Sequence, residues 1–108
     1  MIQRRQLDIF HAVADPTRRR LLDLLAAGEQ PVQKLVPQFD MSFQAVSLHL
    51  KVLAEAGLVS RRKAGRFRYY KAEPQGLREV YDWVSRYQRF WEARLDRLGT
   101  YLAKSELE

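Results

Sequence analysis

The sequence predicts a mainly α-helical fold with one small β-hairpin, and three observations point to it. Apolar residues recur at three- and four-residue steps in four segments up to residue 56 and in a long segment after residue 75. The basic and aromatic stretch 59–72 carries Gly65 near its centre, where a tight turn between two strands needs a positive backbone dihedral. A short turn joins the third and fourth helical segments, as in a helix-turn-helix. We therefore predict one winged helix-turn-helix domain of order α-α-α-α-β-β-α that spans residues 1–108.

The first expected helix covers residues 2–14. Leu7 and Phe10, together with either His11 or Ala14, form one apolar stripe along it. We expect this stripe to pack against the last helix of the chain.

The second expected helix begins after Asp15, a good N-cap, and Pro16 suits its first position because the missing amide hydrogen costs nothing there. Its expected core residues are Leu21, Leu22, Leu24 and Leu25. Three arginines occupy its first turns. Such charges are usually solvated or paired with nearby carboxylates, so we expect a structural role for Arg18 and allow phosphate contact for Arg19 or Arg20.

A short third helix from Pro31 and a turn over residues 37–41 lead to the fourth helix, about residues 42–56, which Ser42 caps. Its apolar residues Val46, Leu50 and Leu53 recur at helical spacing and should pack inward. The opposite side carries Gln44, Ser47, Leu48 and Lys51.

This polar face and the basic hairpin beside it together suit a nucleic-acid groove. Amides and hydroxyls hydrogen-bond base edges in a major groove, and Leu48 can meet a thymine methyl group. His49 is weaker evidence, since such a histidine is more often packed or capped. The alternative is an ordinary solvated helix face. The candidate DNA contacts on this helix are Ser42, Gln44, Ala45, Ser47, Leu48, His49 and Lys51.

The hairpin, about residues 59–72, should form the wing. Its cations can straddle phosphates and its tip can enter a minor groove, although lysine and arginine on exposed strand edges also serve to prevent edge pairing. Because strand side chains alternate, only some of them can face DNA. The basic residues in question are Arg61, Arg62, Lys63, Arg66 and Arg68, of which we take Arg62, Lys63, Arg66 and Arg68 as candidate contacts.

The last expected helix runs over about residues 75–104 and carries an apolar stripe too rich for one small helix. The economical interpretation is that it packs on the first helix and on the same helix of a second copy. The candidate dimer interface is Leu7, Phe10, Val84, Tyr87, Trp91, Leu95, Leu98 and Leu102. Alternatively, Trp83, Tyr87 and Trp91 line a small-molecule pocket between subunits, although such spacing more often indicates packing.

Composition narrows the class of protein. The formal net charge is +6 with 19 basic residues, which favours polyanionic partners, and the chain has no cysteine for a disulfide or thiolate metal site. It shows no signal-peptide run and no apolar stretch long enough for a membrane helix, so we expect a cytoplasmic protein. Its two histidines, His11 and His49, lie on different expected helices and no catalytic motif is present, so we predict that it is not an enzyme.

Three segments in this order resemble the ArsR family of bacterial winged helix-turn-helix repressors. Residues 15–22, Asp-Pro-Thr-Arg-Arg-Arg-Leu-Leu, resemble the opening of the family's second helix, and residues 45–53 resemble its recognition helix. Residues 56–59, with Gly65, Arg66 and Tyr70, resemble its wing. The resemblance covers nearly the whole chain. It implies a homodimer that binds double-stranded DNA at an inverted-repeat operator near a promoter and leaves it when a signal arrives, with autorepression as one form of this regulation.

The resemblance does not extend to the family's metal sites. Metal-sensing members carry cysteine pairs before the recognition helix, or aspartate, glutamate and histidine ligands on the last helix. Here residues 31–36 hold no thiol, and the last helix holds no histidine and only Glu79, Asp82 and Glu92 as oxygen donors. Zinc prefers nitrogen and sulfur donors, so we predict no metal site and no cofactor, and an effector that is unknown.

Two other functions remain open from the sequence. The first is a winged-helix interaction module whose basic face docks an acidic protein. The second is a non-specific DNA-binding protein, for which charge alone decides the affinity. Substitution of the predicted base-reading residues separates these from a sequence-specific regulator.

Overall fold

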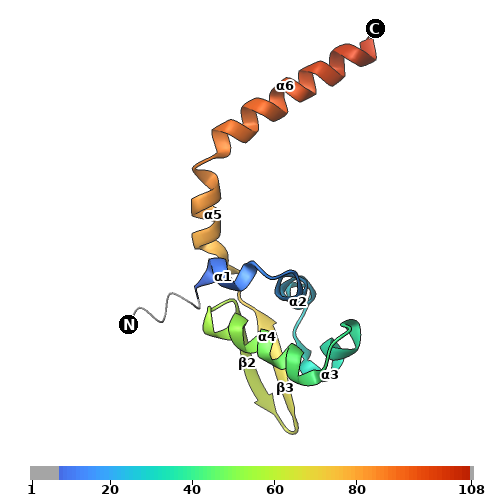
Figure 1. Ribbon diagram of the computed structural model, residues 1–108, viewed down its shortest axis with the longest axis vertical. Helices are drawn as coiled ribbons and strands as arrows, with labels where there is room; N and C mark the ends of the chain where they lie inside the picture. The colour runs from blue at the N-terminus through green and yellow to red at the C-terminus, as the bar shows by residue number, and fades with distance from the viewer. Residues whose placement is uncertain (1–7, 108) are drawn as a thin grey trace. The chain divides into compact units, whose positions relative to one another are not determined.

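The computed structural model describes residues 8–107, and the side chains of residues 8–104. The chain divides into two compact units, and the boundary between them follows Arg78. Figure 1 shows the elements of both units. The described part is mostly helical and has one small antiparallel sheet, which confirms the predicted fold class. No helix within residues 8–107 is both long and apolar enough to cross a membrane.

The first two helices are α1 (Ile9–Val13) and α2 (Pro16–Ala26), each capped by an aspartate. Asp15 accepts a hydrogen bond from the amide of Arg18 at 3.1 Å, and Pro16 takes the first helical position, as predicted. The apolar face of α1 differs from the expected stripe. Ala12 is fully buried and Phe10 is half-buried, whereas His11 and Ala14 are exposed. Leu7 lies outside the described residues.

The helix-turn-helix consists of α3 (Val32–Leu35) and α4 (Phe43–Glu55), joined through the 3-10 helix η2 (Val36–Gln38). The Ser42 hydroxyl caps α4 by accepting from the amide of Ala45 at 3.1 Å. At the other end Gly57 takes a φ of +81°, and the Leu58 amide donates to the carbonyl of Leu53 at 2.9 Å. This left-handed C-terminal cap turns the chain directly from α4 into the wing.

The wing is the hairpin of β2 (Val59–Ala64) and β3 (Phe67–Ala72), whose turn projects beyond the helices of its unit (Figure 1). Gly65 in the turn has the predicted positive φ, +63°. The sheet has a third strand, β1 (Gln30–Pro31), which pairs with the outer side of β3 and gives the order β1-β3-β2.

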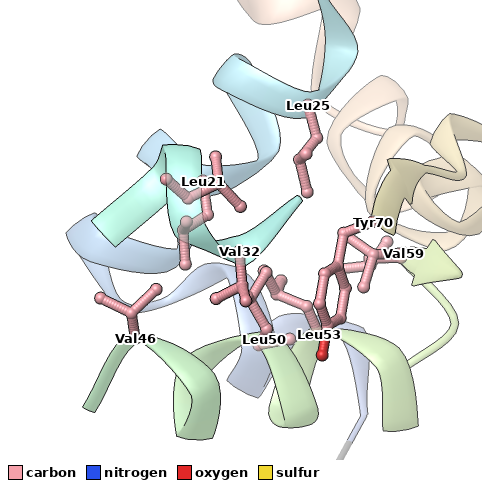
Figure 2. Packing of buried hydrophobic residues seen from close by; sticks show 11 residues of the cluster. Leu21, Leu25, Val32, Val46, Leu50, Leu53, Val59 and Tyr70 are labelled. Atoms are coloured by element: carbon pink, nitrogen blue, oxygen red, sulfur yellow. The ribbon is translucent and has the colours of Figure 1, made fainter. Parts of the chain in front are cut away.

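The core of the first unit lies between α2, α3, α4 and the base of the wing (Figure 2). Val46, Leu50 and Leu53 of α4 are all fully buried, as their spacing predicts. Leu21 and Leu25 of α2 are buried too, while Leu22 and Leu24 are partly exposed. The buried apolar residues are Ala12, Leu21, Leu25, Val32, Leu35, Val46, Leu50, Leu53, Leu58, Val59 and Tyr70. One face of α4 is therefore held firmly, which fixes the direction of the opposite face.

The C-terminal part follows the 3-10 helix η3 (Pro74–Leu77) and contains α5 (Arg78–Ser85) and α6 (Gln88–Leu107). The sequence predicts one helix over about 75–104. The structure instead has a tight turn at residues 86–87, where amide-to-carbonyl bonds span three residues rather than four. Along α6 the apolar side chains stay open to solvent, and Leu95 and Leu98 are 64% and 52% exposed.

Candidate nucleic-acid interface

The pairing of β2 with β3 sorts the basic residues of the wing onto two faces. Directly opposed residues of an antiparallel pair lie on the same face, and the side alternates along each strand. Arg61 is opposite the buried Tyr70, and Lys63 is opposite Arg68. Arg62, between them, is opposite Tyr69 and lies on the other face. The cations on the core-facing side therefore flank α4.

An open groove of about 450 Å³ separates the exposed face of α4 from this side of the wing. From α4 it is lined by both polar and apolar side chains, and from the wing by two arginines and Tyr70. Its lining residues are Val32, Phe43, Gln44, Ser47, Leu48, Lys51, Arg61, Arg68 and Tyr70. The lining includes three cations, Lys51, Arg61 and Arg68, and no carboxylate, so the groove favours an anionic occupant.

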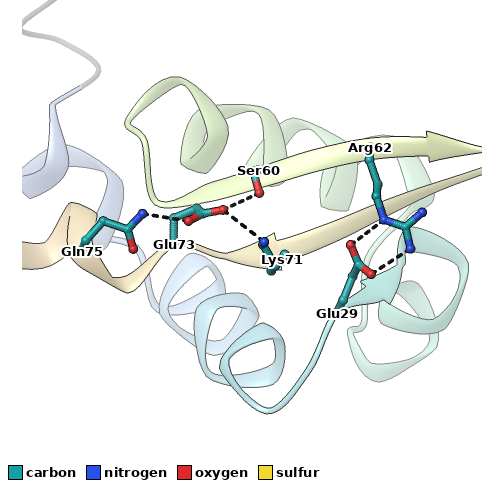
Figure 3. A network of polar contacts seen from close by, with 6 residues as sticks. All are labelled: Glu29, Ser60, Arg62, Lys71, Glu73 and Gln75. Atoms are coloured by element: carbon teal, nitrogen blue, oxygen red, sulfur yellow. Dashed lines mark hydrogen bonds and ion pairs between the residues drawn. The ribbon is translucent and has the colours of Figure 1, made fainter.

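Arg62 on the other face of the wing is held by Glu29 (Figure 3). Its Nε and Nη2 atoms donate to the two carboxylate oxygens of Glu29, each at 2.9 Å, and its guanidinium lies 4.8 Å from the ring centre of Tyr69. The hydrogen bond from Arg62 holds the pKa of Glu29 below its usual value. Arg62 thus connects the wing to the segment that precedes β1, and its predicted contact with DNA stays a prediction.

A second polar cluster fixes the base of the wing (Figure 3). The Ser60 hydroxyl donates to Glu73 at 2.6 Å, and the Gln75 amide donates to the other oxygen of Glu73 at 2.8 Å. These two bonds, with a weaker attraction from Lys71 at 3.9 Å, lower the pKa of Glu73. Because Glu73 follows β3 directly, the cluster ties both strands of the wing to η3.

His49 contacts a buried arginine rather than the groove. Arg18, 9% exposed, donates from Nε to the carbonyl of Ala12 at 2.7 Å and from Nη2 to that of His11 at 3.1 Å. Its Nη1 atom lies 3.1 Å from Nδ1 of His49 on α4. Arg18 therefore has the predicted structural role, and it joins the end of α1 to α4.

Asp15, the N-cap of α2, is influenced by the same arginine and histidine. Burial raises its pKa, but the hydrogen bond from the Arg18 amide and the electrostatic attraction of His49 and Arg18 outweigh burial, so the pKa lies below its usual value. Asp15 therefore favours the charged form in the folded chain, where it also caps α2.

The predicted contacts on α4 occupy different positions around the helix. Gln44, Leu48 and Lys51 are exposed and Ser47 is half-buried, and all four line the groove. Ala45 and His49 are half-buried and do not line it. The Ser42 hydroxyl is occupied as the N-cap.

On the wing, Arg66 is exposed in the turn and Lys63 is exposed on β2. Our sequence-based set of contacts omits the two exposed groove residues Phe43 and Arg61, as well as the buried Val32 and Tyr70. Arg61 shares a face with Arg68, and the turn at Gly65 sets this register, so the alternation of strand side chains could have indicated Arg61. The aromatic Phe43 gives no comparable signal in the sequence.

The described part of the chain holds no cluster of potential metal ligands. Within it, no three histidine, aspartate or glutamate side chains lie close enough together to hold an ion. The chain also has no cysteine, so it offers no thiolate ligand.

Comparison with known proteins identifies the fold's family. A family model described as bacterial regulatory protein, arsR family, matches residues 15–61, from the cap of α2 into β2. The transcriptional repressor SdpR of Bacillus subtilis is 34% identical over 71% of this chain and 86% of its own length. The chain belongs to the ArsR family.

Other relatives agree with this ArsR-family assignment. The HTH-type transcriptional regulator Rv2034 of Mycobacterium tuberculosis is 41% identical over 80% of this chain and 78% of its own. The solved structure of a possible transcriptional regulator for arsenical resistance is 52% identical, covers 81% of this chain and 88% of its own, and superposes with a TM-score of 0.64. This ArsR-family protein is a DNA-binding transcriptional regulator and not an enzyme.

Proposed function

We propose that the protein is a homodimeric repressor that binds an inverted-repeat operator through α4 and the wing. One observation carries the proposal: the exposed face of α4 and two wing arginines, Arg61 and Arg68, line one groove without a carboxylate. An α-helix fits the major groove of DNA, and the cations beside α4 reach the flanking phosphates.

The groove residues divide between base reading and phosphate contact. Gln44 and Ser47 carry the amide and hydroxyl that hydrogen-bond base edges. Lys51, Arg61 and Arg68 supply positive charge on either side. Lys63 and Arg66, towards the turn of the wing, reach the phosphates or the minor groove of the adjoining segment. Arg62 contacts DNA only when Glu29 releases it.

The dimer accounts for the exposed apolar side chains of α5 and α6. Trp91, Leu95, Leu98 and Leu102 are between 51% and 64% exposed and recur at steps of three and four residues. A continuous apolar stripe of this length is unusual on a monomer, and the same helix of a second copy covers it through a two-fold interface. Phe10, half-buried on α1, belongs to the same predicted interface, as do Val84 and Tyr87.

Because the proposed dimer is two-fold symmetric, its affinity for DNA depends on the spacing between the two half-sites of the operator. The recognition helices of a dimer meet half-sites about one helical turn apart, roughly 34 to 36 Å. A signal that rotates one subunit against the other misaligns one α4 and releases the operator without touching DNA. Since the donor set fits no zinc-type site, we extend the proposal to a signal other than a bound metal ion.

The proposal is tested by fluorescence anisotropy with a duplex from the region upstream of the chain's own gene and a scrambled duplex of equal composition. We expect tight binding to an imperfect palindrome in the first, weak binding to the second, and a loss of about 10³-fold or more between 50 and 200 mM salt. Equal affinity for both duplexes at every salt concentration contradicts a sequence-specific repressor.

Matched variants separate the roles of the groove residues. Gln44→Ala and Ser47→Ala should change which sequences are preferred, because they remove hydrogen bonds to bases. Arg66→Ala should weaken binding to the operator and the scrambled duplex alike, because a phosphate contact carries no sequence information. If Ser47→Ala and Gln44→Ala leave DNA binding unchanged, α4 does not read bases and the face serves another partner.

A further inference from the structure

Leu48 is an apolar side chain in an exposed, polar setting. It is 61% exposed in the middle of α4 and contributes nothing to the buried core. Its neighbours on the exposed face are Gln44, Ser47 and Lys51, and all line the same groove. A leucine at such a position leaves apolar surface in water in the free protein, so it has no evident role in stability.

The surroundings of Leu48 restrict what can cover it. Three cations line the groove, on α4 and on both strands of the wing, and no carboxylate faces them there. The groove therefore favours an anionic occupant that also presents an apolar group to Leu48. In the major groove, the backbone phosphates supply the charge, and the C5-methyl group of thymine is the one apolar group among the edges of the four bases.

We propose that Leu48 is a specificity-determining residue that packs against a thymine methyl group in each half-site. The inference rests on the proposed binding of α4 in a major groove. Gln44 and Ser47, beside Leu48, hydrogen-bond the neighbouring base edges, while Lys51 and the wing arginines fix the helix against the phosphates. The operator therefore carries a thymine at one symmetrical pair of positions, where a cytosine, which lacks the C5-methyl group, would leave Leu48 uncovered.

The test replaces thymine with deoxyuridine, which removes the methyl group and leaves every hydrogen-bonding atom in place. The probe is a duplex selected by the protein from a random-sequence library, in which symmetrical pairs of thymines are replaced one pair at a time. Burial of one methyl group is worth about a fourfold change in affinity, so the critical pair should cost a dimer about 15-fold.

The Leu48→Ala variant tests whether Leu48 is the residue that contacts the methyl group. Alanine favours helix at this exposed position, so the variant should fold, and it should bind the thymine and deoxyuridine duplexes with equal affinity. Lys51→Ala is the matched control from the same face. It should weaken binding to both duplexes by the same factor and keep the roughly 15-fold preference for thymine, because it removes a charge and no apolar contact.

The outcomes distinguish this inference from the function on which it rests. If no sequence is enriched from the library, the proposed repressor function itself fails. If a sequence is enriched but no deoxyuridine pair lowers the affinity, the thymine contact is refuted while sequence-specific binding stands. If a pair lowers the affinity equally in the wild type and in Leu48→Ala, another residue meets the methyl group and the assignment to Leu48 is wrong.

Discussion

Arg18 of α2 lies with its Nη1 atom 3.1 Å from Nδ1 of His49, in the middle of α4. A guanidinium can only donate, so the contact is a hydrogen bond when Nδ1 of His49 carries no proton. The same arginine binds the carbonyls of His11 and Ala12 at the end of α1. One buried side chain therefore sets the position of α4 relative to the first helix, which we expect to belong to the dimer interface.

Replacement of Arg18 should destabilise the fold more than replacement of its neighbours. Arg18→Met keeps the volume but leaves two carbonyls and a histidine nitrogen without their donor, so we expect the free energy of unfolding to fall by about 2 to 4 kcal/mol. Urea unfolding followed by circular dichroism measures it. Arg19→Ala is the control, because this exposed arginine donates one bond, to Val13, and should cost less than about 1 kcal/mol. Equal losses of unfolding free energy in the two variants would show that Arg18 contributes no more to stability than Arg19 does.

Acid should weaken the fold partly through Asp15. Its pKa in the folded chain lies below the ordinary value of 3.8, so the folded state holds the carboxylate more strongly than the unfolded chain does. The resulting stability is present in full above about pH 5 and is lost as the pH falls through the ordinary and then the folded pKa. Asp15→Asn keeps a good N-cap but loses the charge at the start of α2, which is worth about 0.3 to 1 kcal/mol.

The pH dependence supplies the check on that variant. The difference in unfolding free energy between the wild type and Asp15→Asn should be largest above pH 5 and should shrink steadily towards pH 3. A difference that stays constant over this range would show that the charge of Asp15 contributes nothing and that only the cap matters.

Much of the fold follows from local sequence signals. Asp15 and Ser42 cap their helices, Val46 and its helical repeats are buried, and Gly65 forms the turn of the wing, because each of these depends on neighbours within a few residues. β1 escaped prediction. It has two residues, one of them Pro31, so it shows neither alternation nor strand propensity, and it forms only because β3 offers it a free edge.

The candidate site was predictable in its elements and less so in its side chains. The face of α4 follows from helical spacing, whereas the face of each wing residue depends on strand register. The pairing of Arg62 with Glu29, 33 positions away, is a tertiary contact with no local signal. The same holds for His49 and Arg18, 31 positions apart, although the sequence already favoured a packed histidine and a structural arginine.

The apolar stripe of α6 should decide the oligomeric state. Leu98→Arg places a charge in the stripe, and we expect it to shift the mass in solution from that of two copies to that of one, 12.7 kDa, by light scattering after size exclusion. Asp96→Arg introduces the same side chain two residues away on the other side of α6, where it should leave the dimer intact. A wild-type chain that is already monomeric, with and without operator, would overturn the proposed dimer.

The two faces of the wing should be separable by their salt dependence. Each phosphate contact contributes about 0.9 to the slope of log affinity against log salt concentration. Arg68→Ala removes a cation that lines the groove, so the slope per subunit should fall by about that amount. Arg62→Ala removes a cation that Glu29 already holds on the opposite face, so the slope should change less.

Glu29→Gln tests whether Arg62 can leave its carboxylate partner and contact DNA. It leaves the wing intact and frees the guanidinium from its ion pair. If Arg62 stays on its own face, the salt slope of Glu29→Gln should equal that of the wild type. If Arg62→Ala lowers the slope as much as Arg68→Ala, and Glu29→Gln tightens binding, then Arg62 exchanges Glu29 for a phosphate on the operator. In that case both faces of the wing contact DNA, as the predicted contact of Arg62 requires.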